Sequence, residues 1–403
     1  MKNKKQKIVL AYSGGLDTSY CVKYFSTELG MEVHAVVANN GGFSSGEIKE
    51  IEERAYFLGA ATFKEIDITR DYYHDCIRYM LFGNMKRLDT YPLSVSSERV
   101  FQAMAIAKYA KAEGIKCVAH GSTGAGNDQV RFDLIFKTFI PGIEIFTPIR
   151  DNKLSREYEI KYLKEAGLKW NSEKATYSIN QGIWGTSIGG KETLTSHLPL
   201  PDKAYLHHPK QTKALKVAID FNKGQPASLN GKKYKDPIDL IKQLNELGNK
   251  CAIGRDIHVG DTIIGIKGRV AFEAPAALML IDAHALLEKH VLSKHQLFWK
   301  KQLADWYGMM LHEGNYLEPA MRWIENLLEQ SQEHVTGKVF LTLHPYRYTL
   351  DGISSDNDIM ASRSGVYGEM NNAWTAEDAK GFIHMTSIPF QNYFSIHPNE
   401  LEL

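Results

Sequence analysis

Cysteine is scarce and long apolar runs are missing in this chain of 403 residues. The four cysteines, Cys21, Cys76, Cys117 and Cys251, lie too far apart for a CxxC pair, a zinc knuckle or a dense disulfide framework, so we expect them to be reduced and buried. The basic residues 1–7 precede an apolar run too short for a signal-peptide core, and no later run approaches the length of a membrane span. These observations predict a cytoplasmic protein.

An excess of either charge is also lacking. Lys and Arg number 48 and Asp and Glu number 47, which leaves a formal net charge of +1. Such a chain has no overall basic surface for nucleic acid or an anionic membrane, so we expect small-molecule partners, no nucleic acid and no membrane. The length exceeds what one hydrophobic core usually supports and favours two domains of roughly 150 to 200 residues each.

The first 170 residues alternate short β-rich runs with amphipathic helical stretches. Strands are expected at residues 7–11, 32–38, 61–66 and 116–119, and helices at 48–58, 98–113 and 155–166. This alternation is typical of α/β proteins and predicts a doubly wound parallel-sheet nucleotide-binding domain over residues 1–170.

Beyond residue 170, prolines punctuate shorter alternating runs. We expect an α+β synthetase domain over residues 171–365, with strands at 214–221 and 338–343 and helices at 238–247 and 317–330. The spacing of Thr375 and Asp378 is that of a capping box and predicts a short helix. Residues 366–403 are too few for a core of their own, so they are expected to form a C-terminal arm that docks elsewhere.

The most informative segment is IVLAYSGGLDTS at residues 8–19, where a strand runs into two glycines and a helix follows from about Thr18. Free backbone amides, nearby hydroxyls and the positive end of the helix dipole predict a cradle for a multiply charged phosphate. Asp17 would be unfavourable in an anion site unless a cation accompanied the anion. Its expected role is therefore to hold the Mg²⁺ carried by ATP.

This loop has neither the GxGxxG spacing nor the Gly-Lys-Ser/Thr ending of the commoner nucleotide motifs. It resembles the SGGxDS pyrophosphatase loop, whose enzymes cleave ATP to AMP and pyrophosphate. A Walker-like spacing does occur from Gly185 to Lys191. We interpret it as a coincidence, because Glu192 stands where a magnesium-binding hydroxyl is needed.

A second run, AHGSTGAGNDQVRFD at residues 119–133, also follows a predicted strand, and its glycines allow close backbone approach to a ligand. Its polar groups could bind an amino acid: Arg131 a carboxylate, Asp128 an ammonium, and Asn127 a neutral group such as a ureido. The alternative is an ordinary glycine loop with a surface ion pair.

The two runs together resemble argininosuccinate synthase, whose second signature reads HGxTGKGNDQVRFE. The resemblance extends to YPL at 91–93, YSI at 177–179 and DAKGFI at 378–383, and it spans nearly the whole chain. It implies a ligase that joins citrulline to aspartate through a citrullyl-adenylate, with ATP converted to AMP and pyrophosphate, in arginine biosynthesis. It also implies a homotetramer in which the C-terminal arm reaches a neighbouring subunit.

The resemblance further implies three groups of binding residues. ATP is expected at Ala11, Tyr12, Ser13, Gly14, Gly15, Leu16, Asp17, Thr18, Ser19, Ala38 and Gly121. Aspartate is expected at Thr123, Asn127 and Asp128, and citrulline at Tyr91, Ser96, Asn127, Arg131, Ser178 and Ser187. The expected catalytic residues are Asp17, Asp128 and Arg99, although Arg99 could instead be an ordinary arginine on a helix surface.

Several positions depart from the family pattern. Ala125 replaces a lysine, Gly260 a glutamate and Phe272 a tyrosine, and Asn180-Gln181 replaces an acidic pair. Neutral drift is the simplest explanation of these departures. Two alternatives stay open: the same chemistry on a citrulline whose α-amino group is acylated, which the loss of the pocket carboxylate at Gly260 motivates, and a nucleotide-binding regulatory protein without turnover, which rests on Ala125, Gly260 and Phe272.

Overall fold

The computed structural model describes residues 5–168, 170, 177–362, 365, 368 and 373–401. The chain forms two compact units, Met1–Asn357 and Asp358–Leu403. The first unit contains every residue of the two glycine-rich runs, and each unit is described by itself below.

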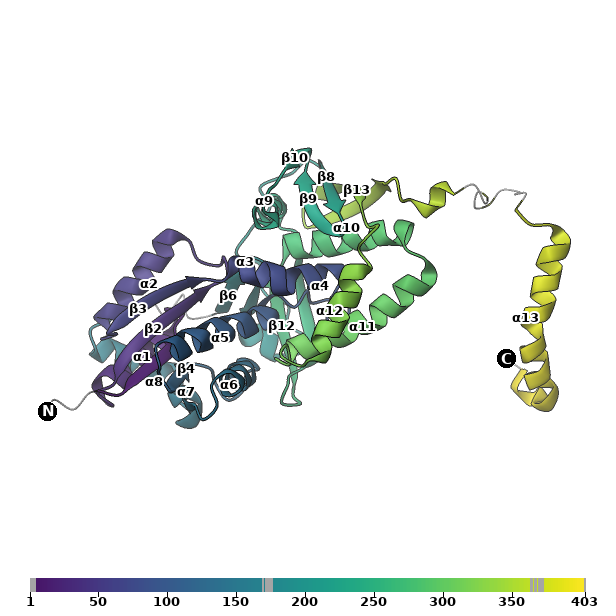
Figure 1. Cartoon of the computed structure of the whole chain (residues 1–403). Helices are drawn as coiled ribbons and strands as arrows, with labels where there is room; N and C mark the ends of the chain where they lie inside the picture. The colour runs from purple at the N-terminus through teal and green to yellow at the C-terminus, as the bar shows by residue number, and fades with distance from the viewer. Residues whose placement is uncertain are drawn as a thin grey trace. The chain divides into compact units, whose positions relative to one another are not determined.

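A parallel sheet of five strands organises the first part of the larger unit, in the order β3-β2-β1-β4-β5 (Figure 1). The strands are β1 (Lys7–Ala11), β2 (Glu32–Asn39), β3 (Thr62–Asp67), β4 (Cys117–His120) and β5 (Glu144–Phe146). The predicted α/β class and the four predicted strands are confirmed, with shifts of one residue at most at either end. Strand β5 was not predicted, because three residues carry too little periodicity to be recognised.

Helices cover both faces of this sheet. Odd and even positions of β1 supply opposite faces, so Ile8 and Leu10 pack in one apolar cluster while Val9 packs in the other. The first cluster is completed by α1 (Leu16–Thr27), α2 (Ser45–Phe57) and α8 (Arg156–Glu165), and the second by α5 (Ser94–Ala112) and α6 (Asp128–Phe139). Shorter helices are α3 (Thr69–Tyr72), the π-helical turn η1 (Tyr73–Ile77), α4 (Arg78–Phe82) and α7 (Pro148–Asp151). The predicted cap of α8 is confirmed, since Ser155 Oγ accepts a hydrogen bond from the Tyr158 amide at 3.3 Å.

Two antiparallel sheets follow within the same unit, in the orders β11-β12-β7-β6 and β10-β9-β8-β13-β14. The first contains β6 (Ser178–Gly182), β7 (Gly185–Gly189), β11 (Arg255–Asp261) and β12 (Lys267–Glu273). The second contains β8 (Leu215–Asn222), β9 (Gln225–Leu229), β10 (Lys232–Lys233), β13 (Gly337–His344) and β14 (Arg347–Ser354). Residues 185–189 of the Walker-like run form β7, a strand of an antiparallel sheet, and Lys191 begins the 3₁₀ turn η3 (Lys191–Leu194); the run therefore forms no phosphate loop between a strand and an α-helix, as the interpretation as a coincidence predicts.

Four long helices accompany these sheets, and α10 packs against β13 and β14. They are α9 (Pro237–Lys250), α10 (Pro275–Val291), α11 (Lys294–His312) and α12 (Ala320–Gln330). Single 3₁₀ turns occur at η3 (Lys191–Leu194) and η4 (Asp202–Ala204). The predicted strands at 214–221 and 338–343 and helices at 238–247 and 317–330 are all present.

The smaller unit consists mainly of α13 (Ala376–Ile396), with 3₁₀ turns η5 (Ile359–Ala361) and η6 (Pro398–Leu401). The predicted capping box is confirmed: the Thr375 amide donates to Asp378 Oδ2 at 2.8 Å, and the Asp378 amide donates to Thr375 Oγ1 at 3.1 Å. The prediction of a short helix is wrong, because α13 has 21 residues. A capping box determines only where a helix begins and says nothing about its length. None of the α13 side chains is buried within the chain.

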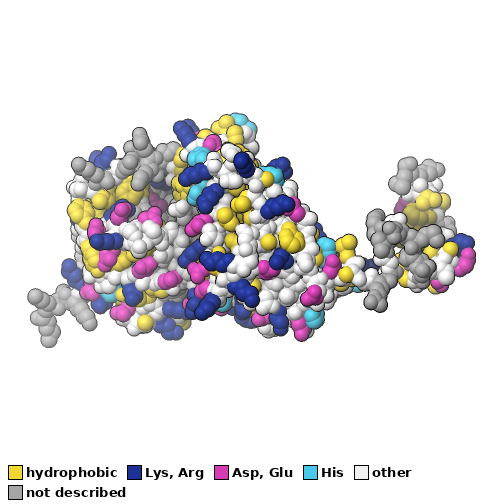
Figure 2. Space-filling view, turned by 90° about the horizontal axis from the view of Figure 1, so that it is seen from above, with side chains coloured by type: hydrophobic (Ala, Val, Ile, Leu, Met, Phe, Trp, Pro, Cys, Tyr) yellow, Lys and Arg dark blue, Asp and Glu magenta, His cyan; other side chains and the backbone are white. Residues whose placement is uncertain are grey.

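Two composition-based expectations can be compared with the structure. The four cysteines are free and buried, as predicted. Within the described residues, no helix is long and apolar enough to cross a membrane. Basic and acidic side chains are interspersed over the face shown in Figure 2.

Candidate active site

The loop that joins β1 to α1, predicted to bind phosphate, lies at the point where the connections from neighbouring strands turn to opposite faces of the parallel sheet. Strand β1 lies between β2 and β4, and the segments that follow β1 and β4 lead to helices on opposite faces of the sheet. Ligands of doubly wound sheets bind in the crevice at such a switch point, beyond the carboxyl ends of the strands. Ala11 and Ala38 occupy these ends of β1 and β2, and Gly121 follows the end of β4.

Gly121 brings the two glycine-rich runs into contact. A Cβ atom at this position would lie 3.1 Å from Asp17 Cβ and 3.1 Å from Thr18 Cγ2. That separation is tighter than ordinary packing tolerates, so a side chain at residue 121 would displace the start of α1. The structure therefore places Gly121 beside Asp17 and Thr18, three residues that the sequence assigned to one ATP site.

The backbone of the loop leaves the start of α1 open. Gly14 has φ +70°, and a Cβ there would lie 2.8 Å from Ile51 Cγ1, so this position needs glycine. Helix α1 begins at Leu16, earlier than the expected Thr18, and its N-cap, Gly15, provides no side-chain cap. The first-turn amides of a helix have no partner inside the helix, and here they are available to an anion.

Hydroxyl groups stiffen this loop from within. Ser13 Oγ accepts a hydrogen bond from the Gly15 amide at 3.3 Å and lies 3.2 Å from Thr18 Oγ1. Tyr12 and Ser19 are buried. The loop is consequently held in its shape by its own side chains before any ligand binds, which lowers the entropic cost of binding.

Asp17 has an unpredicted neighbour, Glu159, which projects from α8 and is buried. Burial raises the pKa of Glu159 to about 8, and the carboxyl of Asp17 acts in the same direction. Burial likewise raises the pKa of Asp17, while Arg156 opposes that shift. Within the described residues, no N–H or O–H donor reaches Glu159 Oε2. Two such carboxyl groups need either a shared proton or a cation between them.

We expect Glu159→Gln to stabilise the free protein increasingly as the pH rises from about 4.5 to about 8. The folded-state pKa of about 8 exceeds the ordinary value of 4.5, so the wild-type proton contributes stability below 4.5 that is lost as the pH rises through 8. Glutamine cannot ionise and avoids this loss. Melting temperatures of both proteins, measured at pH 5, 6.5 and 8 without nucleotide, check this; a constant difference would contradict it.

Asp128 connects two arginines at the start of α6. Its Oδ2 accepts from Arg99 Nε at 3.0 Å and its Oδ1 from Arg131 Nη1 at 2.9 Å. Burial alone would raise the pKa of Asp128, but the two guanidinium groups lower it below its usual range. The alternative of a surface ion pair is wrong, because Arg131 is only 3% exposed.

Arg99 lies at the centre of a wider network. It donates to Glu98 Oε1 at 3.1 Å and to Asn180 Oδ1 at 2.6 Å, and Glu98 in turn accepts from the Asn40 side chain. Its side chain is 12% exposed, so the alternative of a helix-surface arginine is wrong. Burial raises the pKa of Glu98 to about 8. The network joins the end of β2, helices α5 and α6, and strand β6.

Arg131 keeps one nitrogen open. Its Nε donates to the His312 carbonyl at 2.8 Å and its Nη1 to Asp128, whereas Nη2 has no acceptor among the described residues. The neighbouring Asn127 is engaged through Oδ1, which accepts from the Ile263 amide at 2.8 Å. Ile263 belongs to the turn between β11 and β12, so the part of the chain beyond residue 170 contacts the run at residues 119–133.

The remaining predicted citrulline residues occupy different surroundings. Tyr91 is buried, accepts from the Val95 amide at 2.9 Å and contacts Phe272 with ring centroids 5.5 Å apart. Ser187 is buried in β7 opposite Phe272. Ser96 is buried in α5, whereas Ser178 is exposed on β6 and Thr123 is exposed in the loop after β4. Phe272 thus lies close to both Tyr91 and Ser187. Ser178 and Thr123 are exposed to solvent.

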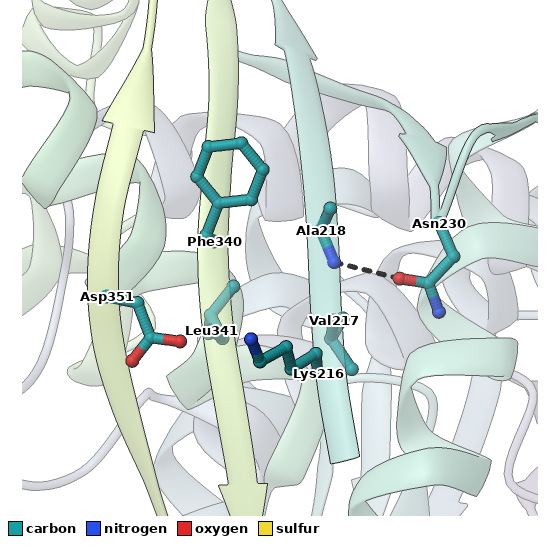
Figure 3. Close-up of a pocket in the computed structure, with 7 residues that line it drawn as sticks. All are labelled: Lys216, Val217, Ala218, Asn230, Phe340, Leu341 and Asp351. Carbon is teal, nitrogen blue, oxygen red and sulfur yellow. Dashed lines mark hydrogen bonds between the residues drawn. The ribbon is translucent and has the colours of Figure 1, made fainter.

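A separate hollow of about 370 Å³ lies on the second antiparallel sheet (Figure 3). Asn230 spans one side, where its Oδ1 accepts from the Ala218 amide at 2.8 Å, and Asp351 lies on the other. Lys216, Val217, Phe340 and Leu341 complete its lining. It contains none of the predicted site residues.

Comparison with known proteins gives the same assignment for both parts of the chain. Residues 7–169 match the family model described as the arginosuccinate synthase N-terminal HUP domain, and residues 177–393 match the arginosuccinate synthase C-terminal domain. The argininosuccinate synthase of Dictyoglomus thermophilum is 34% identical over 392 residues, covering 97% of each chain. That of Metallosphaera sedula is 37% identical over 383 residues, covering 94% of this chain and 96% of the relative.

The parallel sheet, the pyrophosphatase-type loop and the adjoining amino-acid run define an ATP-using ligase. The two family models and the full-length relatives identify which one: the chain belongs to the argininosuccinate synthase family. It catalyses the reaction of that family, in which citrulline and aspartate are joined to argininosuccinate with conversion of ATP to AMP and pyrophosphate, in arginine biosynthesis.

Proposed function

We propose that separate groups of residues at the switch point bind the three substrates, ATP, aspartate and citrulline. The open first turn of α1, with Gly14, Gly15 and Thr18, holds the phosphates of ATP, together with Ala11, Tyr12, Ser13, Leu16, Ser19, Ala38 and Gly121. Thr123, Asn127 and Asp128 hold aspartate, and Tyr91, Ser96, Asn127, Arg131, Ser178 and Ser187 surround citrulline. The contact of Gly121 with Asp17 and Thr18 is the observation that carries this proposal, since it unites the two runs.

The protein promotes the two chemical steps by positioning the substrates and by stabilising negative charge on the phosphates. The ureido oxygen attacks the α-phosphorus and pyrophosphate leaves; the aspartate amine then displaces AMP. Neither step requires a nucleophilic side chain. Preorganised amides at the start of α1 stabilise negative charge that develops on the phosphates, and a low-dielectric site strengthens that interaction. Arg99, held by Asp128 and Asn180, adds a fixed positive charge to the same network.

The carboxyl groups of Asp17 and Glu159 fit a divalent cation. Oxygen ligands suit Mg²⁺, and a cation would replace the proton that the buried pair otherwise shares. Asp17 would hold the Mg²⁺ of the nucleotide, with Glu159 behind it, and the ion would neutralise charge on the departing pyrophosphate.

Aspartate-dependent release of pyrophosphate from ATP, with L-citrulline as the ureido substrate, tests the proposed function. An active ligase releases pyrophosphate and forms AMP in equal amounts. A regulatory protein that only binds nucleotide would release none, even though it would still bind ATP in a calorimeter.

Arg131→Lys is expected to raise the Michaelis constant for citrulline about tenfold or more. Arg131 makes two directed hydrogen bonds, to Asp128 and to the His312 carbonyl, and its Nη2 is open to a ligand, whereas an ammonium group cannot serve all three partners in this geometry. Steady-state kinetics at saturating ATP and aspartate measure this effect. The exposed Lys164→Arg exchange on α8 provides the control, and wild-type constants in Arg131→Lys would contradict the assignment.

We also propose a cytoplasmic homotetramer in which α13 docks on another subunit. Phe382, Ile383 and Phe390 are all more than half exposed on this helix, and such apolar side chains favour a protein partner. Analytical ultracentrifugation of the full chain and of a chain ending at residue 357 tests this, because only the full chain should form tetramers.

A further inference from the structure

The loop at residues 121–127 joins β4 to α6 and carries several residues proposed to bind substrates. Gly121 contacts the start of α1, and Thr123 and Asn127 belong to the proposed aspartate site. Three of its seven residues are glycines and none is charged, so the sequence itself gives the loop little preference for one conformation. Side chains outside the loop have to hold it in place.

His120, the last residue of β4, bonds the loop near its beginning. The Ser122 amide donates to His120 Nδ1 at 3.2 Å, so this nitrogen carries no proton and Nε2 carries one. His120 Nε2 then donates to Asp133 Oδ1 at 2.8 Å. The imidazole is buried and stacks on Phe132, which restricts its rotation away from Ser122.

Gln129, in the first turn of α6, bonds the loop near its end. Its Nε2 donates to the Gly124 carbonyl at 2.6 Å and to the Gly126 carbonyl at 3.1 Å. The side chain is buried, so water competes little for these two hydrogen bonds. Together, His120 and Gln129 hold three backbone groups of the loop.

Arg150, on α7, connects these two side chains, one directly and one through Asp133. Its Nη1 donates to Gln129 Oε1 at 3.4 Å and to Asp133 Oδ2 at 2.9 Å. Burial alone would raise the pKa of Asp133, but the hydrogen bonds from His120 and Arg150 lower it below its ordinary value. The carboxylate therefore stays ionised at neutral pH and keeps both partners. We call Arg150, Asp133, His120 and Gln129 the loop clamp.

We propose that the loop clamp positions residues 121–127 for aspartate binding, with Arg150 as the positioning residue that joins its two ends. The inference rests on the proposed function, in which Thr123 and Asn127 hold aspartate. The four side chains of the clamp bind no substrate in that proposal. They act through the backbone of the loop, which fixes where Thr123 and Asn127 lie before aspartate binds.

Steady-state kinetics distinguish positioning from a general loss of folded protein. Arg150→Met should raise KM for aspartate about tenfold or more and change KM for citrulline less than about threefold, because most of the proposed citrulline contacts lie outside the loop. A fall in kcat with both Michaelis constants unchanged would show that Arg150 only stabilises the fold, and would overturn the proposal.

The matched control removes a different partner of the same arginine. Arg150 Nε also contacts the exposed Asp151 carboxylate at 3.3 Å, and Asp151 does not contact the loop. Asp151→Asn should therefore change neither Michaelis constant by more than about twofold. A rise in KM for aspartate as large as that of Arg150→Met would contradict the assignment to the clamp.

Two exchanges at Asp133 test whether its carboxylate is needed. An amide has one acceptor oxygen, so in Asp133→Asn it can serve His120 or Arg150 but not both, and KM for aspartate should rise about tenfold. Asp133→Glu keeps a carboxylate, which the family signature also has at this position, and should stay within about threefold of the wild type. Equal Michaelis constants for the two variants would overturn the clamp.

Amide hydrogen exchange tests the clamp without turnover. In the nucleotide-free protein, the peptide spanning residues 121–127 should exchange about tenfold faster in Arg150→Met than in the wild type, and Asp151→Asn should match the wild type. Unchanged exchange in Arg150→Met would overturn the clamp even in an active enzyme. A wild type that releases no pyrophosphate but shows this difference would contradict the proposed function and still support the clamp.

Discussion

Replacing Asp17 with asparagine is expected to lower kcat by about a hundredfold or more while leaving the fold intact. The carboxyl of Asp17 lies at the start of α1, beside Gly121 and the buried carboxyl of Glu159. Asparagine has nearly the same shape and can donate a hydrogen bond to Glu159, so packing is preserved. Its neutral amide cannot hold the cation that offsets triphosphate charge, and the first chemical step loses that stabilisation.

Steady-state pyrophosphate release and thermal unfolding, measured on the same preparations, check this prediction. Glu159→Gln is the matched control: it changes the partner carboxyl but leaves the proposed metal ligand, so it should reduce kcat less than Asp17→Asn. An Asp17→Asn variant with a wild-type melting temperature and a wild-type kcat would remove Asp17 from the proposed metal site.

The two glycine-rich runs of this site could be predicted because each is a short continuous segment of the sequence. The strand–glycine–helix order of residues 8–19 predicts β1 to the residue, although α1 begins at Leu16, two residues before the predicted Thr18. The run at 119–133 likewise contains both the glycines and the polar groups that follow β4. In both cases the hydrogen bonds that define the geometry join neighbours in sequence.

Other parts of the site depend on contacts between distant segments and left no recognisable pattern. Glu159 has the spacing of an ordinary helix residue, and only the packing of α8 on α1 shows that it meets Asp17. The pairing of β8 with β13 was also beyond prediction, because long-range register depends on tertiary packing.

Replacing Arg99 with methionine is expected to destabilise the protein by about 3 to 5 kcal/mol and to abolish most of its activity. Methionine fills much of the volume but leaves Asp128 with one guanidinium partner and removes the donor to Asn180 Oδ1. Breaking a buried ion pair from one side costs more than the pair contributes, because the remaining charge stays buried. The start of α6, and with it the run proposed to bind aspartate, should lose its fixed position.

A double-mutant cycle with Asp128→Asn isolates the pairwise contribution. If the Arg99–Asp128 contact is coupled as the distances indicate, the double variant should be more stable than the sum of the single effects by about 1 to 3 kcal/mol in chemical denaturation. Arg70→Met is the matched control, since Arg70 is 75% exposed in its pair with Asp236, and its effect should stay within about 0.5 kcal/mol. Strict additivity of Arg99→Met and Asp128→Asn would show that the two residues act independently, and Arg99 would then lose its role in positioning Asp128.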